Sequence, residues 1–302
     1  MLSVALIIVT GVIIVMPKRI DYSSYLAAII DKQERLERLP SPKIIFVGGS
    51  NLVFNIDSRR IEAEFARPVA NMGVHVSLGL RFMLNQIRSC IGRGDIVIVL
   101  PEYEQFYYSF DGDGVYLLHS FVIFPRGIKF LNSARQFIDS FKDIPVFIKG
   151  RFEALTKKKR GSIYNRYAFN EYGEIEVPES VASRKEVNEE LFEKPIDDYL
   201  FEDEAIGVLN EFARYVSEHG AEIYIVFPCV PEKWYARNRK IIMNIYKRLH
   251  NDCGIPILFD PRSCVLPQKC FFDSMYHLNQ SGRKLNTEKL IATLKGVMQL
   301  KR

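Results

Sequence analysis

Short, almost wholly apolar runs alternate with amphipathic stretches along this chain, and this alternation limits its fold more than any other feature. The runs begin close to a glycine or a proline and consist mainly of Ile, Val, Leu and Phe, as strands buried on both faces of a sheet do. A strand–helix–strand rhythm indicates parallel strands joined by helical crossovers. We expect strands over residues 43–49, 68–71, 96–100, 221–227 and 255–259, and helices over 58–66, 77–91, 202–218, 240–249 and from 280 onward.

These elements predict an α/β fold, a three-layer sandwich built on a parallel sheet of about five strands. The chain has 302 residues, of which 48% are hydrophobic, which is enough for one large domain of this class. The rhythm is interrupted over about residues 103–200, first by an aromatic-rich stretch and then by a polar one. We therefore assign residues 43–302 to one α/β domain with an insertion at about 103–200.

Charge and cysteine content exclude several classes of function. The net charge of +5 is modest, and no stripe of basic and aromatic residues indicates a nucleic-acid partner. Five cysteines leave no complete disulfide framework, and the absence of a Cys-x-x-Cys pair argues against a zinc site. Buried free thiols are the favoured interpretation, with a bridge among Cys253, Cys264 and Cys270 left open. We expect no metal ion and no cofactor.

The N-terminus carries an apolar segment, Leu2–Met16, followed by a proline and two basic residues. As a helix, this segment would span about 22 Å, less than a hydrocarbon core of about 30 Å. We interpret residues 1–20 as a membrane anchor or signal-like segment; the alternative is an apolar element packed on the body of the protein. Helical spacing of apolar residues over Asp21–Arg38 then predicts a helical stalk or linker over residues 21–42.

Ser50 is the strongest candidate for chemistry. It follows the first predicted strand and two glycines, so it would lie at the carboxyl edge of the sheet, where open α/β sheets place their sites. Near the other end of the chain, His277 follows Asp273 by four positions. A histidine can take the proton of a serine hydroxyl, and a carboxylate can orient the histidine. These three residues predict a nucleophilic triad.

Acyl transfer also needs hydrogen-bond donors for the oxyanion that forms on the carbonyl oxygen. The backbone amide of Ser50 is one candidate. Gly73, after the second predicted strand, is another, because it has no side chain to keep the substrate from its N–H.

The order of these motifs resembles the SGNH, or GDSL-like, hydrolase superfamily. The resemblance rests on the strand ending in Gly-Gly-Ser50-Asn51, on Asn71-Met72-Gly73, and on Asp273 with His277-Leu278-Asn279. It implies a flavodoxin-like strand order, Ser50 as nucleophile, Gly73 as an oxyanion donor, and Asp273 and His277 as acid and base.

Two features depart from the superfamily pattern. Aspartate and histidine are usually three residues apart there, whereas the separation here is four. The third motif usually supplies an asparagine as an oxyanion donor, but this chain has Pro101-Glu102-Tyr103-Glu104 after the third predicted strand. Asn51 is the candidate substitute; otherwise the site has two donors.

The resemblance implies a serine-dependent acyl-ester hydrolase or O-acyltransferase. The layout is most similar to membrane-anchored members that act on cell-envelope or exported polysaccharides, which implies an acylated glycan or small ester as substrate and a membrane-bound acyl donor as a partner. It also implies an extracytoplasmic domain on a bacterial membrane, although Lys18 and Arg19 favour the opposite orientation. The alternative is a catalytically inactive glycan-binding or assembly protein of the same fold.

Three further signals have structural explanations. Glu102 and Glu104 suggest a glycosidase pair, but such carboxylates flank the scissile bond, so we favour a solvated or substrate-contacting loop. The aromatic residues between Tyr103 and Tyr116 suit either sugar stacking or a buried core, and we favour the core. His75 is either a site residue or a bystander.

Overall fold

The computed structural model describes residues 19–156, 163–178, 196 and 201–299. Its main sheet has the strand order β2-β1-β3-β4, and every neighbouring pair is parallel. Apart from Glu222, every residue of these strands is buried, which explains why the runs are apolar. The predicted α/β class and parallel sheet are confirmed. The strands are β1 (Ile44–Gly48), β2 (Val69–Asn71), β3 (Ile96–Leu100) and β4 (Glu222–Ile225).

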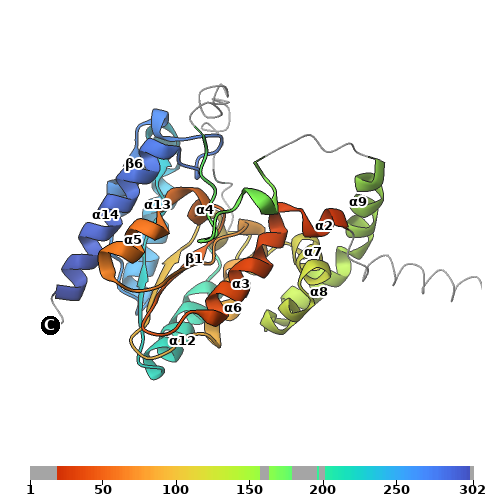
Figure 1. Cartoon of the computed structure of the whole chain (residues 1–302), viewed down its shortest axis with the longest axis horizontal. Helices are drawn as coiled ribbons and strands as arrows, with labels where there is room; N and C mark the ends of the chain where they lie inside the picture. Colours follow the sequence, from red (N-terminus) through yellow and green to blue (C-terminus); the bar gives the residue numbers. More distant parts are fainter. Residues whose placement is uncertain (1–18, 157–162, 179–195, 197–200, 300–302) are drawn as a thin grey trace, which may run out of the picture.

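Helices cover both faces of the sheet, as three layers require. Figure 1 shows α5 and α14 on one face and α3, α6 and α12 on the other. Asp57 caps α5 by accepting a hydrogen bond from the Arg60 amide at 3.0 Å. The helices of this layer arrangement are α3 (Ala28–Arg38), α5 (Ser58–Phe65), α6 (Leu80–Arg88), α12 (Glu204–Glu218), α13 (Glu232–Asp252) and α14 (Gln280–Gln299).

The fifth strand that we predicted over residues 255–259 is reduced to a single parallel bridge between Ile257 and Ile225. The Ile225 amide donates to Pro256, and the Leu258 amide donates to Ile225, both at 2.9 Å. Proline has no N–H, so residue 256 can accept from β4 but cannot donate a ladder bond. The chain therefore runs beside β4 in the expected place without forming a full strand.

Residues 21–38 are largely helical, as predicted, but residues 21–42 do not form a free stalk. They contain α2 (Arg19–Tyr22), a 3₁₀ helix (Tyr25–Ala27) and α3. Ile29 and Leu36 of α3 are buried in the main core, and α3 packs against β2. The apolar stripe that predicted a helix also needed burial, and the sheet supplies it.

The insertion at about 103–200 begins with a group of helices that lies at the opposite end of the molecule from α14 (Figure 1). These are α7 (Gly114–Ile123), α8 (Ala134–Lys142) and α9 (Ile144–Thr156). Residues 163–178 then return to the main domain, where Ile175 and Val177 pack with Val53 and Phe54 of α4 (Asn51–Asn55). The insertion thus contributes to the core around the carboxyl edge of the sheet.

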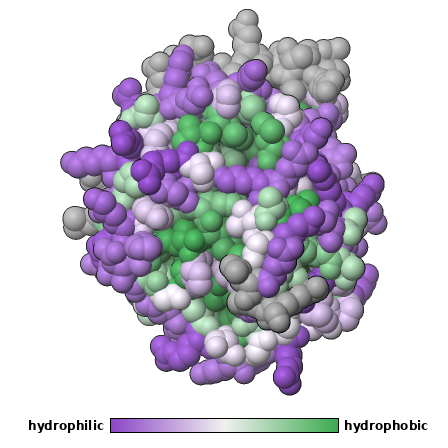
Figure 2. Space-filling model, turned by 90° about the vertical axis from the view of Figure 1, so that its left-hand side faces the viewer, coloured by the Kyte–Doolittle hydropathy of each residue, from purple (hydrophilic) through white to green (hydrophobic). Residues whose placement is uncertain are grey.

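The predicted apolar segment Leu2–Met16 lies outside the described residues. Within the described ranges, no helix is long and apolar enough to cross a membrane. Figure 2 shows the side of the molecule that carries α14, where hydrophobic side chains appear in the middle of the face inside a rim of hydrophilic ones.

Candidate active site

The first turn of the site is formed where β1 ends. Gly48 and Gly49 lead to Ser50, which precedes α4. A Cβ atom on Gly48 would lie 2.4 Å from the Leu100 carbonyl oxygen, and one on Gly49 would lie 2.4 Å from Glu102 Oε1. Gly48 is needed because the backbone of β3 approaches this turn so closely, and Gly49 leaves room for the Glu102 side chain. Ser50 therefore lies between the ends of β1 and β3, where the strand order changes direction.

The three residues predicted to form a triad lie in hydrogen-bond contact. His277 Nε2 is 2.9 Å from Ser50 Oγ, and His277 Nδ1 is 2.9 Å from Asp273 Oδ1. The histidine ring packs against Phe54, with 4.2 Å between ring centroids. These distances are those that a serine, a general base and an orienting carboxylate require.

A compact loop accommodates the four-residue separation of Asp273 and His277. An antiparallel bridge between Phe271 and Leu278 closes the loop, and the Phe272 amide donates to the His277 carbonyl at 2.8 Å. The Leu278 amide also donates to Asn55 Oδ1 at 2.9 Å, which ties the loop to α4. His277 therefore reaches Ser50, and Asp273 reaches His277, although the spacing is unusual.

Tyr164 is a site residue that the sequence analysis missed. Its hydroxyl donates to Asp273 Oδ2 at 2.6 Å and lies 3.2 Å from His277 Nδ1. Burial, followed by the hydrogen bond to Asp273, raises the pKa of Tyr164 well above its usual value, which favours the neutral hydroxyl. A single tyrosine in a polar insertion carries no local signal of this contact.

The two predicted oxyanion donors, at Gly73 and Asn51, already have hydrogen-bond partners within the protein. The Gly73 amide donates to Asn71 Oδ1 at 3.0 Å. The side chain of Asn51 donates to the Leu100 carbonyl at 3.0 Å and accepts from the Leu52 amide at 2.9 Å. The absence of a side chain at Gly73 serves packing instead, because a Cβ there would lie 2.4 Å from the Leu52 Cβ. In this conformation, neither predicted group is available to a substrate oxygen.

Glu102 occupies the space beside the nucleophile and is not in a solvated loop. Its Oε1 lies 3.4 Å from Ser50 Oγ and 3.3 Å from the Asn51 amide nitrogen, and the residue is 3% exposed. Burial, and then repulsion by Glu104, raise its pKa from 4.5 to about 8. Glu104 itself accepts from the Tyr276 hydroxyl, so the two carboxyls have different partners.

The triad opens into a cavity of about 310 Å³. Two side chains at its wall, His75 and Tyr116, stack with 4.3 Å between their ring centroids. Burial, and then the proximity of His277, lower the pKa of His75 to about 4, so its ring is neutral at pH 7. By contrast, Tyr103 and Phe106 lie in the core, as we favoured for this aromatic stretch. The residues that line the cavity are Ser24, Tyr25, Leu26, Ser50, His75, Tyr116, Tyr164 and His277.

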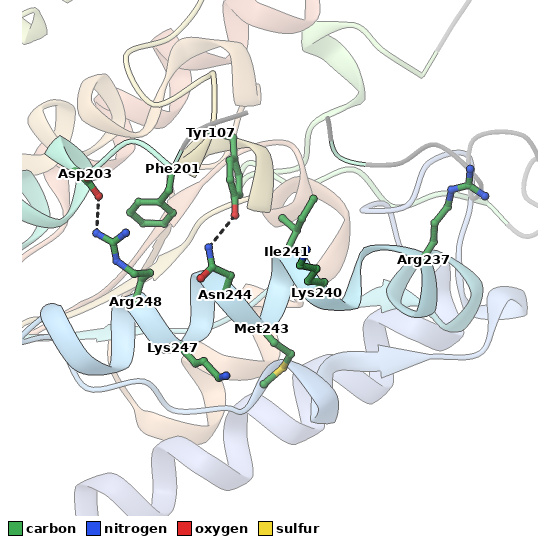
Figure 3. Close-up of a pocket in the computed structure, with 10 residues that line it drawn as sticks. All are labelled: Tyr107, Phe201, Asp203, Arg237, Lys240, Ile241, Met243, Asn244, Lys247 and Arg248. Carbon is green, nitrogen blue, oxygen red and sulfur yellow. Dashed lines mark hydrogen bonds and ion pairs between the residues drawn. The ribbon is translucent and has the colours of Figure 1, made fainter. Parts of the chain in front are cut away.

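A larger cavity of about 920 Å³ lies elsewhere, along α13, and none of the triad residues lines it (Figure 3). At one end, Arg248 pairs with Asp203 and stacks on Phe201; further along, Asn244 points toward the hydroxyl of Tyr107 (Figure 3). The described residues that line it include several basic side chains and no serine or cysteine paired with a base. The smaller cavity, which Ser50 and His277 line, is therefore the better candidate for the active site.

No protein-family model matches the chain, and no curated protein matches its sequence. The likeness to SGNH hydrolases therefore rests on the motifs themselves.

Proposed function

We propose that the protein is a serine-dependent acyl-ester hydrolase or O-acyltransferase. One observation carries this proposal: an unbroken pair of 2.9 Å contacts that joins Ser50 Oγ through His277 to Asp273. Serine is a weak nucleophile without a base, and this relay supplies one. Packing alone gives little reason for a serine near one end of the chain to meet a histidine and an aspartate near the other, so we interpret these contacts as functional.

The geometry supports a two-step mechanism. Ser50 Oγ attacks the ester carbonyl while its proton passes to His277 Nε2, and Asp273 stabilises the charged imidazole through Nδ1. Collapse of the tetrahedral intermediate releases the alcohol, which takes the proton from His277. An acyl group then remains on Ser50. Attack by water gives an esterase, and attack by a sugar hydroxyl gives an O-acyltransferase.

For the substrate, we propose an acylated cell-envelope or exported polysaccharide, or a small ester. The motif resemblance and the aromatic walls of the cavity, among them Tyr25, Tyr116 and Tyr164, support this class because sugar rings stack on aromatic side chains. A membrane-bound acyl donor would serve the transferase form of the reaction.

For location, we propose an anchor at residues 1–20 and an extracytoplasmic domain on a bacterial membrane. The apolar segment Leu2–Met16 supports the anchor, and the positive charges of Lys18 and Arg19 count against this orientation. A reporter fused to the C-terminus distinguishes the two orientations: phosphatase activity is expected outside the cytoplasm, and fluorescence of a cytoplasmic reporter would contradict the proposal.

A second candidate function is a binding or assembly protein whose site has lost its chemistry. The contact of Glu102 with the Asn51 amide favours it, since an ionised carboxylate there would compete with the oxyanion. Absence of acetyl-ester hydrolysis by the wild-type chain, together with retained glycan binding, would support this candidate over the enzyme.

A fluorophosphonate probe, which reacts with activated serines, tests the proposed nucleophile. We expect labelling of the wild-type chain and of Ser24→Ala, a control that lines the same cavity. We expect none of Ser50→Ala, and His277→Ala should hydrolyse p-nitrophenyl acetate more than about 10³-fold more slowly. Equal labelling of wild type and Ser50→Ala would remove Ser50 as the nucleophile.

A further inference from the structure

Glu102, just beyond β3, lies where the oxygen of an attacked ester carbonyl would need hydrogen-bond donors. Glu102 follows β3 by two positions, and its Oε1 is within 3.4 Å of both Ser50 Oγ and the Asn51 amide nitrogen. The Ser50 backbone amide also forms a hydrogen bond with this carboxyl. The oxygen of a carbonyl attacked by Ser50 would lie next to the same amides, because an oxyanion site is built around the nucleophile. Glu102 would therefore be in contact with it.

The fold makes room for this carboxyl and holds it in place. Gly49 has no Cβ, and one built there would lie 2.4 Å from Glu102 Oε1. The Glu102 amide donates to Gln105 Oε1 at 3.0 Å, which fixes the start of the 3₁₀ helix Tyr103–Phe106. Together with the bonds from the Ser50 and Asn51 amides to the carboxyl, this pre-organises Glu102, as electrostatic stabilisation of a transition state requires.

The other candidate donors are already committed. The Gly73 amide bonds to Asn71, and the Asn51 carboxamide bonds to backbone groups of Leu100 and Leu52. The backbone amides of Ser50 and Asn51 both bond to the Glu102 carboxyl, so a proton on Glu102 would add a further donor at this place. A carboxylic acid has one O–H to donate, whereas a carboxylate has none.

We propose that Glu102 is a catalytic residue that donates a hydrogen bond from its neutral carboxyl to the oxyanion formed when Ser50 attacks an ester. The inference rests on the proposed function and deepens it: it names a donor in place of the asparagine that the superfamily pattern would supply. A buried carboxylic acid kept neutral in order to donate is an established device in other enzymes.

The surroundings of Glu102 favour the neutral form at pH 7. Burial and Glu104 raise its pKa to about 8, and the donors from Ser50 and Asn51 oppose that shift without cancelling it. Ionisation above about pH 8 would remove the donor and place a negative charge beside the oxyanion. The other titratable groups around this site include Tyr25, His75, Tyr164, Asp273, Tyr276 and His277.

The proton on Glu102 is not transferred at any step. The new bond joins Ser50 Oγ to the carbonyl carbon, the hydroxyl proton moves to His277 Nε2, and the π electrons of the carbonyl move onto its oxygen. Glu102 keeps its O–H bond and donates to that oxygen. When the intermediate collapses, the ester C–O bond breaks and the departing alkoxide takes the proton from His277.

The test is kcat/KM for a short-chain p-nitrophenyl ester between pH 5.5 and 9.5, corrected for background hydrolysis. We expect the wild-type value to fall above about pH 8. Glu102→Gln, whose carboxamide donates at every pH, should stay within about tenfold of wild type at pH 7 and lack this fall. Glu102→Ala should lose about 10²–10³-fold at pH 7.

Glu104→Gln is the matched control. It keeps an acceptor for Tyr276 but removes the charge that raises the pKa of Glu102, so the alkaline fall should move to lower pH. Thermal unfolding followed by circular dichroism checks that each variant folds. If Glu102→Ala fails to fold, the pH profile of Glu102→Gln decides the question.

Two results would overturn this inference and leave the proposed function intact: Glu102→Ala as active as wild type, or Glu102→Gln with an unchanged alkaline fall. Greater activity of Glu102→Ala would show instead that the carboxyl blocks the site. A wild-type chain that neither hydrolyses the ester nor reacts with a fluorophosphonate would overturn the proposed function and this inference with it.

Discussion

At Glu102, burial and hydrogen bonding act on one carboxyl in opposite directions. Burial raises its pKa to about 8, while donors from Ser50 and Asn51 favour the ionised form. In the unfolded chain the group releases its proton near its ordinary value of 4.5. Between these two pH values, the folded protein holds a proton that the unfolded chain has lost. The free energy of unfolding therefore falls as the pH rises through this window.

Glu102→Gln removes this titration and preserves the shape of the side chain. We expect the free energy of unfolding of the variant, relative to wild type, to grow by about 2–4 kcal/mol between pH 4.5 and 8. Urea unfolding at several pH values in that range measures the difference. A difference that does not change with pH would show that Glu102 does not titrate there.

In the proposed mechanism, Tyr164 would act through its hydrogen bond to Asp273, so we regard it as a positioning residue. Tyr164→Phe removes the donor to Asp273 Oδ2 and keeps the ring that packs against Phe54 and Tyr25. We expect kcat for ester hydrolysis to fall about tenfold, a loss of one charge-assisted hydrogen bond, with KM and the melting temperature nearly unchanged. A rise in KM with constant kcat would indicate a substrate-binding role instead.

At the scale of elements, α14 and residues 163–178 are joined by a buried ion pair. Arg283 of α14 pairs with Glu174, which is 1% exposed and also accepts from the Ser58 amide at 3.0 Å. The same arginine donates to the Ile56 carbonyl at 2.7 Å. This network holds the segment that carries Tyr164 beside α4, so part of the site depends on a contact outside it.

Arg283→Met would leave Glu174 buried without its charged partner. We expect a loss of about 3–5 kcal/mol in the free energy of unfolding at pH 7, because an uncompensated buried charge is costly. Arg60→Ala breaks the exposed pair with Glu288 and should cost less than about 1 kcal/mol. Urea unfolding compares the two variants. Equal losses would show that the buried pair contributes no more to the free energy of unfolding than the exposed pair does.

At the scale of the whole molecule, the site gathers residues from nearly the full length of the described chain. The cavity wall includes Tyr25, which precedes the first strand, and the triad ends with His277, which precedes the last helix. The 3₁₀ helix of Tyr25 and the following α3 are part of the main core rather than a linker.

This packing predicts where the chain tolerates truncation. A chain that begins at residue 19 keeps every described core contact, so we expect the wild-type melting temperature and fluorophosphonate labelling. A chain that begins at residue 43 loses Ile29 and Leu36 from the core and exposes apolar surface over β2. We expect it to be insoluble or unfolded by circular dichroism. A stable, labelled chain from residue 43 would show that the helix is only a linker.

The sequence alone determined the class of the fold and the order of its elements. Strand and helix periodicities depend on neighbouring residues, and each buried strand must be apolar wherever it lies in the sheet. The meeting of Ser50, Asp273 and His277 was also predictable, because each residue type has a distinct chemical task and the order matched a known motif pattern.

Only the tertiary structure decided the remaining parts of the site. It showed that the Gly73 amide donates to the Asn71 side chain and the Asn51 side chain to the Leu100 carbonyl, that Tyr164 bonds to Asp273, and that Glu102 lies against Ser50. A hydrogen bond depends on positions to within a few tenths of an ångström, and those positions arise from the packing of segments far apart in the chain. Local sequence patterns do not determine how segments far apart in the chain pack. A buried carboxyl beside a nucleophile and a solvated carboxyl in a loop therefore look alike in the sequence.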